Sequence, residues 1–161
     1  MRGSKDFYTF RGYSLHSSQH PDSLTPSMED YLEMIYRLSA EEGYTRVLEV
    51  AQALHVQPPS ASRMIQRLAE ADFLVYEKYS IIRLTPRGEE IGRFLLRRHN
   101  TLESFLRFLG VGEVLEDAEK IEHNISSAAL QAVEKLLAFF ARHPDCRAAW
   151  EEFRSGKEPW P

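Results

Sequence analysis

The feature that most restricts the fold of this chain is a pair of short helical patterns followed directly by a β-hairpin pattern. Residues 47–54 form a short amphipathic helix pattern, and after a three-residue turn Pro58 begins a second one that runs to about Ala71. Two β-rich runs, 73–77 and 81–85, then flank a polar connection of three residues. A hairpin directly after a helix-turn-helix is a wing, so the pattern predicts a winged helix. The alternative is an ordinary helical hairpin with a solvated polar face.

The second helix of the pair carries side chains suited to contacting DNA. Its apolar residues fall on one face and its short polar, Arg and Gln side chains on the other. Arg63 and Gln66 are candidates for bonding base edges in a major groove, whereas Arg67, and Lys78 near the tip of the wing, are candidates for phosphate. The full set of predicted DNA-binding residues is Ser60, Ser62, Arg63, Gln66, Arg67 and Lys78.

Charge is divided unevenly along the chain. The net charge of the whole protein is −4, but residues 57–98 hold eight Lys and Arg against five Asp and Glu, which gives +3 there and −7 elsewhere. A basic middle with acidic flanks predicts nucleic acid as one partner and cations as another.

A short acidic stretch in the second half of the chain has the spacing of a metal site. Residues 113–124 contain no Gly or Pro and are predicted to be helical, which places Glu119, Glu122 and His123 on one face. Two carboxylates and an imidazole suit a divalent ion such as Mn²⁺ or Fe²⁺. Taken alone, the stretch is more typical of a solvated acidic face than of a metal site.

Further potential ligands lie on two other predicted helices. Thr25-Pro26 begins a helix that Gly43 is expected to end, and Asp30 and Glu33 are neighbours on it. His99 lies in the middle of a long helix predicted from Thr85-Pro86 to about Leu109. Each of these has a bland alternative as well, because acids in a first helical turn and single histidines are usually surface or structural residues.

The C-terminal part of the chain is predicted to be helical and to need an apolar partner. Residues 126–142 are too apolar for an exposed helix, so they predict a core element or a dimer interface, and a short helix is expected around Trp150. No apolar run approaches the ~20 residues of a membrane span. The single cysteine, Cys146, is compatible with a reducing cytosol, and the N-terminus lacks a secretory signal.

With these residues in place, the chain resembles the diphtheria toxin repressor family of metal-dependent winged-helix repressors, and within it the manganese transport regulators. The similarity is collinear over roughly residues 25–140. It lies in Thr25-Pro26-Ser27-Met28-Glu29-Asp30-Tyr31-Leu32-Glu33, Gly43-Tyr44 with Arg46-Val47, Met64-Ile65-Gln66-Arg67-Leu68, Tyr76-Glu77-Lys78-Tyr79, Arg98-His99, Phe105-Leu106 with Gly110-Val111, and Ile121-Glu122-His123.

The resemblance implies a metal site and a function. It places the ligands on Asp30, Glu33, His99, Glu119, Glu122 and His123, enough donors for a pair of ions with Glu33 or Glu122 bridging. Iron-responsive relatives have Met at the position of Asp30 and Cys at that of Glu119, so the all-O/N set here favours Mn²⁺ over Fe²⁺ or other divalent metals. The implied protein is a cytoplasmic, homodimeric, Mn²⁺-activated repressor of metal-uptake genes that binds double-stranded operator DNA.

The predicted architecture is mainly α. A mobile N-terminal extension (1–24) precedes a winged helix-turn-helix domain with a small β-hairpin wing (25–92), an all-helical dimerisation and metal-binding domain (93–143) and a C-terminal tail or short helix (144–161). The extension and the extra proline at Pro58-Pro59 depart from the family pattern, which leaves the operator sequence open.

Three functional alternatives remain at this point. The first two are a winged-helix regulator responding to Fe²⁺ and one responding to a small organic ligand. The third is a carboxylate-bridged di-metal enzyme, although such bundles repeat Glu-x-x-His on two helices and this chain has no such repeat. The sequence predicts no enzyme, no membrane partner and no small organic substrate.

Overall fold

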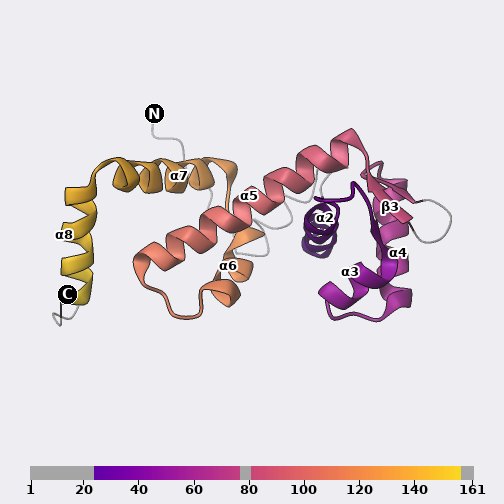
Figure 1. Ribbon diagram of the computed structural model, residues 1–161, viewed down its shortest axis with the longest axis horizontal. Coiled ribbons are helices and arrows are strands. Elements are labelled where there is room, and N and C mark those ends of the chain that lie inside the picture. The colour runs from indigo at the N-terminus through magenta and orange to yellow at the C-terminus, as the bar shows by residue number, and fades with distance from the viewer. Residues whose placement is uncertain (1–23, 77–80, 157–161) are drawn as a thin grey trace, which may run out of the picture. The chain divides into compact units, whose positions relative to one another are not determined.

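The computed structural model describes residues 24–76 and 81–156. The chain divides into two compact units, one up to Leu96 and one from Arg97. Within the described residues the elements are almost all helical, with one small sheet in the first unit (Figure 1). The mainly helical winged-helix architecture predicted from the sequence is therefore confirmed. The predicted N-terminal extension and Lys78 lie outside the described residues, apart from Leu24.

The first unit opens with three helices: α2 (Pro26–Leu38), α3 (Val47–Ala53) and α4 (Pro58–Glu70). The Thr25 hydroxyl accepts a hydrogen bond from the Met28 N–H, so Thr25-Pro26 begins α2 as predicted. The predicted end at Gly43 was wrong. α2 stops at Leu38 with Ser39 as its C-cap. The Ala40 N–H turns back to the Arg37 carbonyl, and Gly43, at φ 74°, lies in the turn beyond.

Three short antiparallel strands complete this unit: β1 (Thr45–Arg46), β2 (Leu74–Tyr76) and β3 (Ile81–Leu84). β3 is central, and pairs Val75 with Arg83 on one side and Thr45 with Ile82 on the other. The predicted hairpin is confirmed as β2 and β3. Sequence analysis missed β1, because two residues are too short for a period-2 pattern to be recognised.

The helices and the sheet of the first unit pack together around one hydrophobic core. Fully buried apolar side chains come from α2, α3, α4 and the sheet: Leu32, Ile35, Val50, Ala61, Ile65, Leu68 and Ile82. Each buried Leu, Ile or Val stabilises the fold by about 1.5–3 kcal/mol. This burial fixes which face of α2 and α4 points inward. The opposite face of each helix carries the side chains that are candidates for binding metal (α2) and DNA (α4).

The remaining helices are α5 (Pro86–Leu109), α6 (Val114–Glu122), α7 (Ser127–Arg142) and α8 (Pro144–Ser155). The Thr85 hydroxyl begins α5 by accepting from the Gly88 N–H, and it donates to the Asp72 carbonyl, 2.8 Å away. The predicted helix 113–124 is shorter than expected. It ends at Glu122, with His123 as its C-cap, because the Asn124 N–H turns back to the Ile121 carbonyl.

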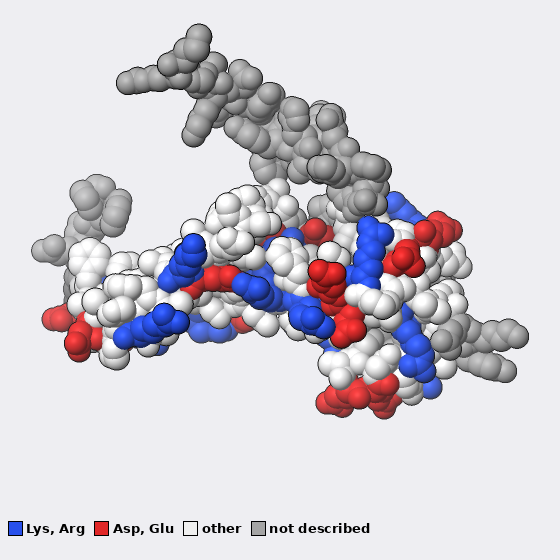
Figure 2. Space-filling model, turned by 90° about the horizontal axis from the view of Figure 1, so that it is seen from above, with Lys and Arg blue, Asp and Glu red and all other residues white. Residues whose placement is uncertain are grey.

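The second unit has a smaller core, formed by Leu102, Leu106, Ala118 and Leu130. Pairing of charged side chains supplements it. Arg97 on α5 donates to Glu134 on α7 (Nε to Oε1, 2.7 Å), and basic and acidic side chains are interspersed over the face drawn in Figure 2. The Trp150 indole N–H bonds the Phe108 carbonyl and joins α8 to the end of α5. No helix in the described ranges is long and apolar enough to cross a membrane.

Candidate metal and DNA sites

Helix α2 carries the first two predicted ligands on neighbouring turns. Asp30 is exposed, whereas Glu33, one turn later, is 8% exposed. A carboxylate that is removed from water needs a positive or hydrogen-bonding partner. Arg37 is that partner. Both its Nε (2.9 Å) and its terminal NH2 group (2.5 Å) donate to the same Glu33 oxygen, Oε1.

Helices α5 and α6 of the second unit bring two further ligands together. His99 on α5 and Glu122 on α6 are both buried, and His99 Nδ1 lies 3.0 Å from Glu122 Oε2. Because the carboxylate accepts this hydrogen bond, the imidazole proton belongs on Nδ1. His99 Nε2 then carries a lone pair that could serve a metal, which is the usual arrangement of a ligand histidine held by a carboxylate.

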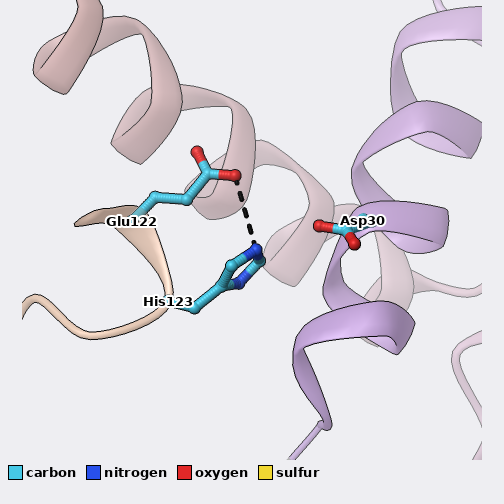
Figure 3. A group of neighbouring side chains, drawn as sticks. All are labelled: Asp30, Glu122 and His123. Atoms are coloured by element: carbon cyan, nitrogen blue, oxygen red, sulfur yellow. Dashed lines mark ion pairs between the residues drawn. The ribbon is translucent and has the colours of Figure 1, made fainter. Parts of the chain in front are cut away.

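The end of α6 places His123 beside the same glutamate. His123 Nε2 lies 3.7 Å from Glu122 Oε1, as the dashed line in Figure 3 marks; Asp30 of α2 is drawn there too. Glu119 lies one turn earlier on α6 and is exposed. The face expected for Glu119, Glu122 and His123 therefore holds side chains in three environments: exposed, buried and half-buried.

Two of these carboxylates already have a partner within the chain. The guanidinium of Arg37 offsets the charge of Glu33, whereas the neutral imidazole of His99 donates a hydrogen bond to Glu122 and leaves its charge in place. Of the two, only Glu33 is therefore paired with a permanent cation. Any cation at Glu33 must share the carboxylate with a guanidinium.

The donor chemistry fits a first-row divalent ion. Glu33, Glu122 and His99 are all buried, and they offer carboxylate oxygen and imidazole nitrogen. Oxygen and nitrogen donors suit Mn²⁺ and Fe²⁺, and the part of the chain that is described offers no buried thiolate, since Cys146 is exposed. Sequence reasoning missed Arg37, although its i, i+4 spacing from Glu33 was a usable signal.

The predicted DNA-binding face of α4 is open to solvent. Ser60, Arg63, Gln66 and Arg67 are exposed and Ser62 is half-buried, while Ala61 on the opposite face is fully buried. The Arg63 guanidinium lies 3.4 Å from the Ser60 hydroxyl, and each stays available on the surface.

A second basic cluster lies on the outer face of the sheet, and the sequence did not point to it. The guanidinium carbons of Arg46 and Arg83 lie 5.6 and 5.4 Å from the centroid of the Tyr44 ring. Arg46 precedes α3 and Arg83 belongs to β3, so only the pairing of β1 with β3 brings them together.

Comparison with known proteins decides the family. Residues 23–82 match the family described as "Iron dependent repressor, N-terminal DNA binding domain", and residues 85–151 match its "metal binding and dimerisation domain". The HTH-type transcriptional regulator MntR of Bacillus pumilus is 48% identical over 118 residues, which cover 72% of this chain and 82% of that protein. The chain belongs to the iron-dependent repressor family.

Other members of the iron-dependent repressor family agree with this assignment. MntR of Listeria welshimeri is 42% identical over 135 residues, covering 83% of this chain and 95% of the relative. The solved structure of the manganese regulator SloR has a TM-score of 0.63 and 31% identity, and that of the metal-dependent transcriptional regulator MtsR 0.65 and 33%. The chain spans 55% of the length of each of these two solved chains and 72% of its own length is covered.

Membership of the iron-dependent repressor family decides between the functional alternatives that the sequence left open. The chain contains the DNA-binding domain and the metal-binding and dimerisation domain of a repressor family, and its relatives are named transcriptional regulators. The protein is a metal-dependent DNA-binding regulator and not an enzyme. The family assignment therefore argues against two of the alternatives, the di-metal enzyme and the regulator that responds only to a small organic molecule.

Proposed function

We propose that this protein is a Mn²⁺-activated homodimeric repressor that acts in the cytoplasm on operator DNA of metal-uptake genes. The observation that carries the proposal is the set of buried O/N donors, Glu33, His99 and Glu122, in a chain 48% identical to a protein named MntR. The absence of sulfur from the proposed ligand set favours Mn²⁺ over Fe²⁺. Fe²⁺ and other divalent metals remain the competing activators.

The proposed ligands are those that the family resemblance implies: Asp30, Glu33, His99, Glu119, Glu122 and His123. Asp30 and Glu33 belong to the unit that carries the DNA-binding helices, and the other four to the unit that follows Leu96. Ligands drawn from both units would make metal binding and the placement of the DNA-binding helices depend on each other. The six donors are enough for two ions per subunit.

Operator recognition is proposed to require two copies of the chain. One exposed helix face, that of α4, reads one half-site, and the two-fold dimers of this class place their recognition helices about 34–36 Å apart along one face of DNA. Arg63 and Gln66 would contact bases. Ser60, Ser62, Arg67 and Lys78 would contact the backbone or adjacent edges.

The decisive experiment measures operator binding by fluorescence anisotropy, with duplexes selected from random DNA by the Mn²⁺-loaded protein. Titration with Mn²⁺, Fe²⁺ and Zn²⁺ should show the strongest activation with Mn²⁺. The coupling must also be reciprocal, so that operator DNA tightens Mn²⁺ binding by the factor with which Mn²⁺ tightens operator binding. Equal operator affinity with and without metal would overturn the proposed function.

Loss of a base-reading arginine should reduce both affinity and discrimination. We expect Arg63→Ala to weaken binding to the selected operator by about 1–3 kcal/mol and to relax specificity at one base position. Arg93→Ala is the matched control, because Arg93 is exposed on α5 and is engaged by Glu89, 3.1 Å away. The assignment of Arg63 fails if a panel of single-base variants is ranked alike by Arg63→Ala and the parent.

A further inference from the structure

The second unit contains a cavity whose lining residues have no role in the function proposed above. It has a volume of about 570 Å³ and is lined by side chains of α5, α7 and α8. Binding sites for small organic molecules have volumes of about 300–1,000 Å³ and combine an apolar wall with a few polar groups. The size of the cavity therefore suits a small organic ligand, and its lining decides which kind.

The apolar wall of the cavity is built from aromatic rings. The rings of Phe108 on α5 and Phe140 on α7 both line it, and their centroids lie 4.7 Å apart. On its other side Phe108 stacks with Trp150 of α8, at 5.7 Å, and its carbonyl accepts the indole N–H, 3.3 Å away. Contacts among three helices thus hold this wall in place. Phe108 and Phe140 are only half-buried, so an apolar ligand could still cover part of each ring.

The polar part of the lining is predominantly basic. Arg107, Arg147 and Arg154 line the cavity, and Glu151 is the acidic residue among its lining side chains. Arg107 donates to Glu103 at 2.6 Å and Arg147 to Glu151 at 2.9 Å, each four residues along its own helix. With both carboxylates counted, one positive charge is in excess. A guanidinium has five N–H donors, so a single carboxylate partner leaves donors for a further acceptor. The cavity is therefore suited to a ligand with one negative charge.

The position of Arg154 depends on a glycine. Its guanidinium lies against Gly110, just beyond the end of α5, where a Cβ would overlap it. Gly110 has a φ of 84°, a conformation that glycine adopts without strain. Because this backbone is bare, Arg154 can reach from α8 to the end of α5 and place a cation beside the aromatic wall.

We propose that this cavity binds a small organic monoanion, a carboxylate with an apolar body. The apolar body would lie against the rings of Phe108 and Phe140. Arg154 would bind the carboxylate, since a planar guanidinium matches its two oxygens with parallel N–H···O bonds. Arg107 and Arg147 would add positive charge and further donors. This site is separate from the proposed Mn²⁺ response and does not depend on it.

The test measures binding of octanoate to the full chain by calorimetry, without added metal, so that the carboxylate cannot bind through a metal ion. 1-Octanol has the same alkyl chain without the charge, and acetate has the carboxylate without the chain. We expect octanoate to bind at least about tenfold more tightly than either, because a hydrogen bond to a charged group contributes that much. In Trp160→Phe protein Trp150 is the only tryptophan, and its fluorescence should change with octanoate because its ring stacks on Phe108.

Two variants separate the charge from the cavity. Arg154→Met should weaken octanoate binding about tenfold and leave 1-octanol binding unchanged. Ala141 also lines the cavity, and Ala141→Leu adds bulk there with a residue that favours helix, so it should weaken binding of both ligands. Lys135→Met is the matched control. Lys135 is exposed on α7, two positions from Leu137 and hence on the opposite side of the helix, so octanoate binding should be unchanged.

Three results would overturn the proposal. The first is a full chain that binds no octanoate. The second is equal affinity for octanoate and 1-octanol, or an octanoate affinity that Arg154→Met leaves unaltered, either of which would mean that the cavity holds no carboxylate. The third is octanoate binding that appears only after residues 157–161 are removed, which would make that segment of the chain itself the occupant.

Discussion

Glu122→Ala is expected to abolish metal-activated operator binding while the protein stays folded. Glu122 is 4% exposed, and its two oxygens lie near both histidines, 3.0 Å from His99 Nδ1 and 3.7 Å from His123 Nε2. Its removal takes away a proposed ligand and also the group that fixes the His99 tautomer. Loss of an outer partner alone costs 10–100-fold in metal affinity, so losing both roles should cost at least about 100-fold.

The measurements for this variant are Mn²⁺ calorimetry, operator anisotropy and circular dichroism. Glu116→Ala is the matched control on the same helix. Glu116 is exposed and pairs with Lys120, 2.6 Å away, and that hydrogen bond and charge lower the pKa of Glu116 below its usual value. Unchanged Mn²⁺ affinity in folded Glu122→Ala would remove Glu122 from the ligand set.

The helices and the hairpin were predictable because each is encoded within a few neighbouring residues. Thr25-Pro26 and Thr85-Pro86 begin helices through local capping. The helical spacing of apolar residues in 58–70 predicts one buried face, and the structure buries Ala61, Ile65 and Leu68 on it. Helix ends were less predictable. α2 and α6 stop where a backbone N–H turns back on the last turn, at Ala40 and Asn124, and no Gly or Pro marks either point.

The candidate site divides in the same way. The residue types of the proposed ligands and their spacing along each helix can be read from the sequence, and the comparisons support the family whose pattern suggested them. That these residues bind metal stays a prediction. What could not be predicted is which groups the donors contact first. Arg37 contacts Glu33 one helical turn away, and His99 contacts Glu122 across 23 positions of sequence.

Substitutions on the exposed apolar side of helix α7 are expected to have the second large effect, which is loss of the dimer. Residues 126–142 were predicted to be a core element or a dimer interface, and among its apolar side chains only Leu130 is fully within the core of the second unit. Leu136 and Phe139 are 42% and 45% exposed, one turn apart on the same stripe. The chain matches a dimerisation domain over residues 85–151, so a second copy is the partner we propose for this stripe.

A glutamate at position 136 or 139 would bury a charge between the two copies without a partner. We expect the double variant Leu136→Glu, Phe139→Glu to sediment as a monomer. Its operator binding should be at least about 100-fold weaker even with Mn²⁺ present. In the dimer, binding of one subunit to its half-site holds the other subunit close to the second half-site, and the monomer lacks this advantage. Gln131→Glu, also exposed on α7, should remain dimeric.

Mn²⁺ binding by the monomeric variant tests whether the partner subunit contributes to the metal site. If every proposed ligand comes from one chain, the monomer should keep its Mn²⁺ affinity while losing the operator. If the affinity falls with the dimer, the partner contributes to the site.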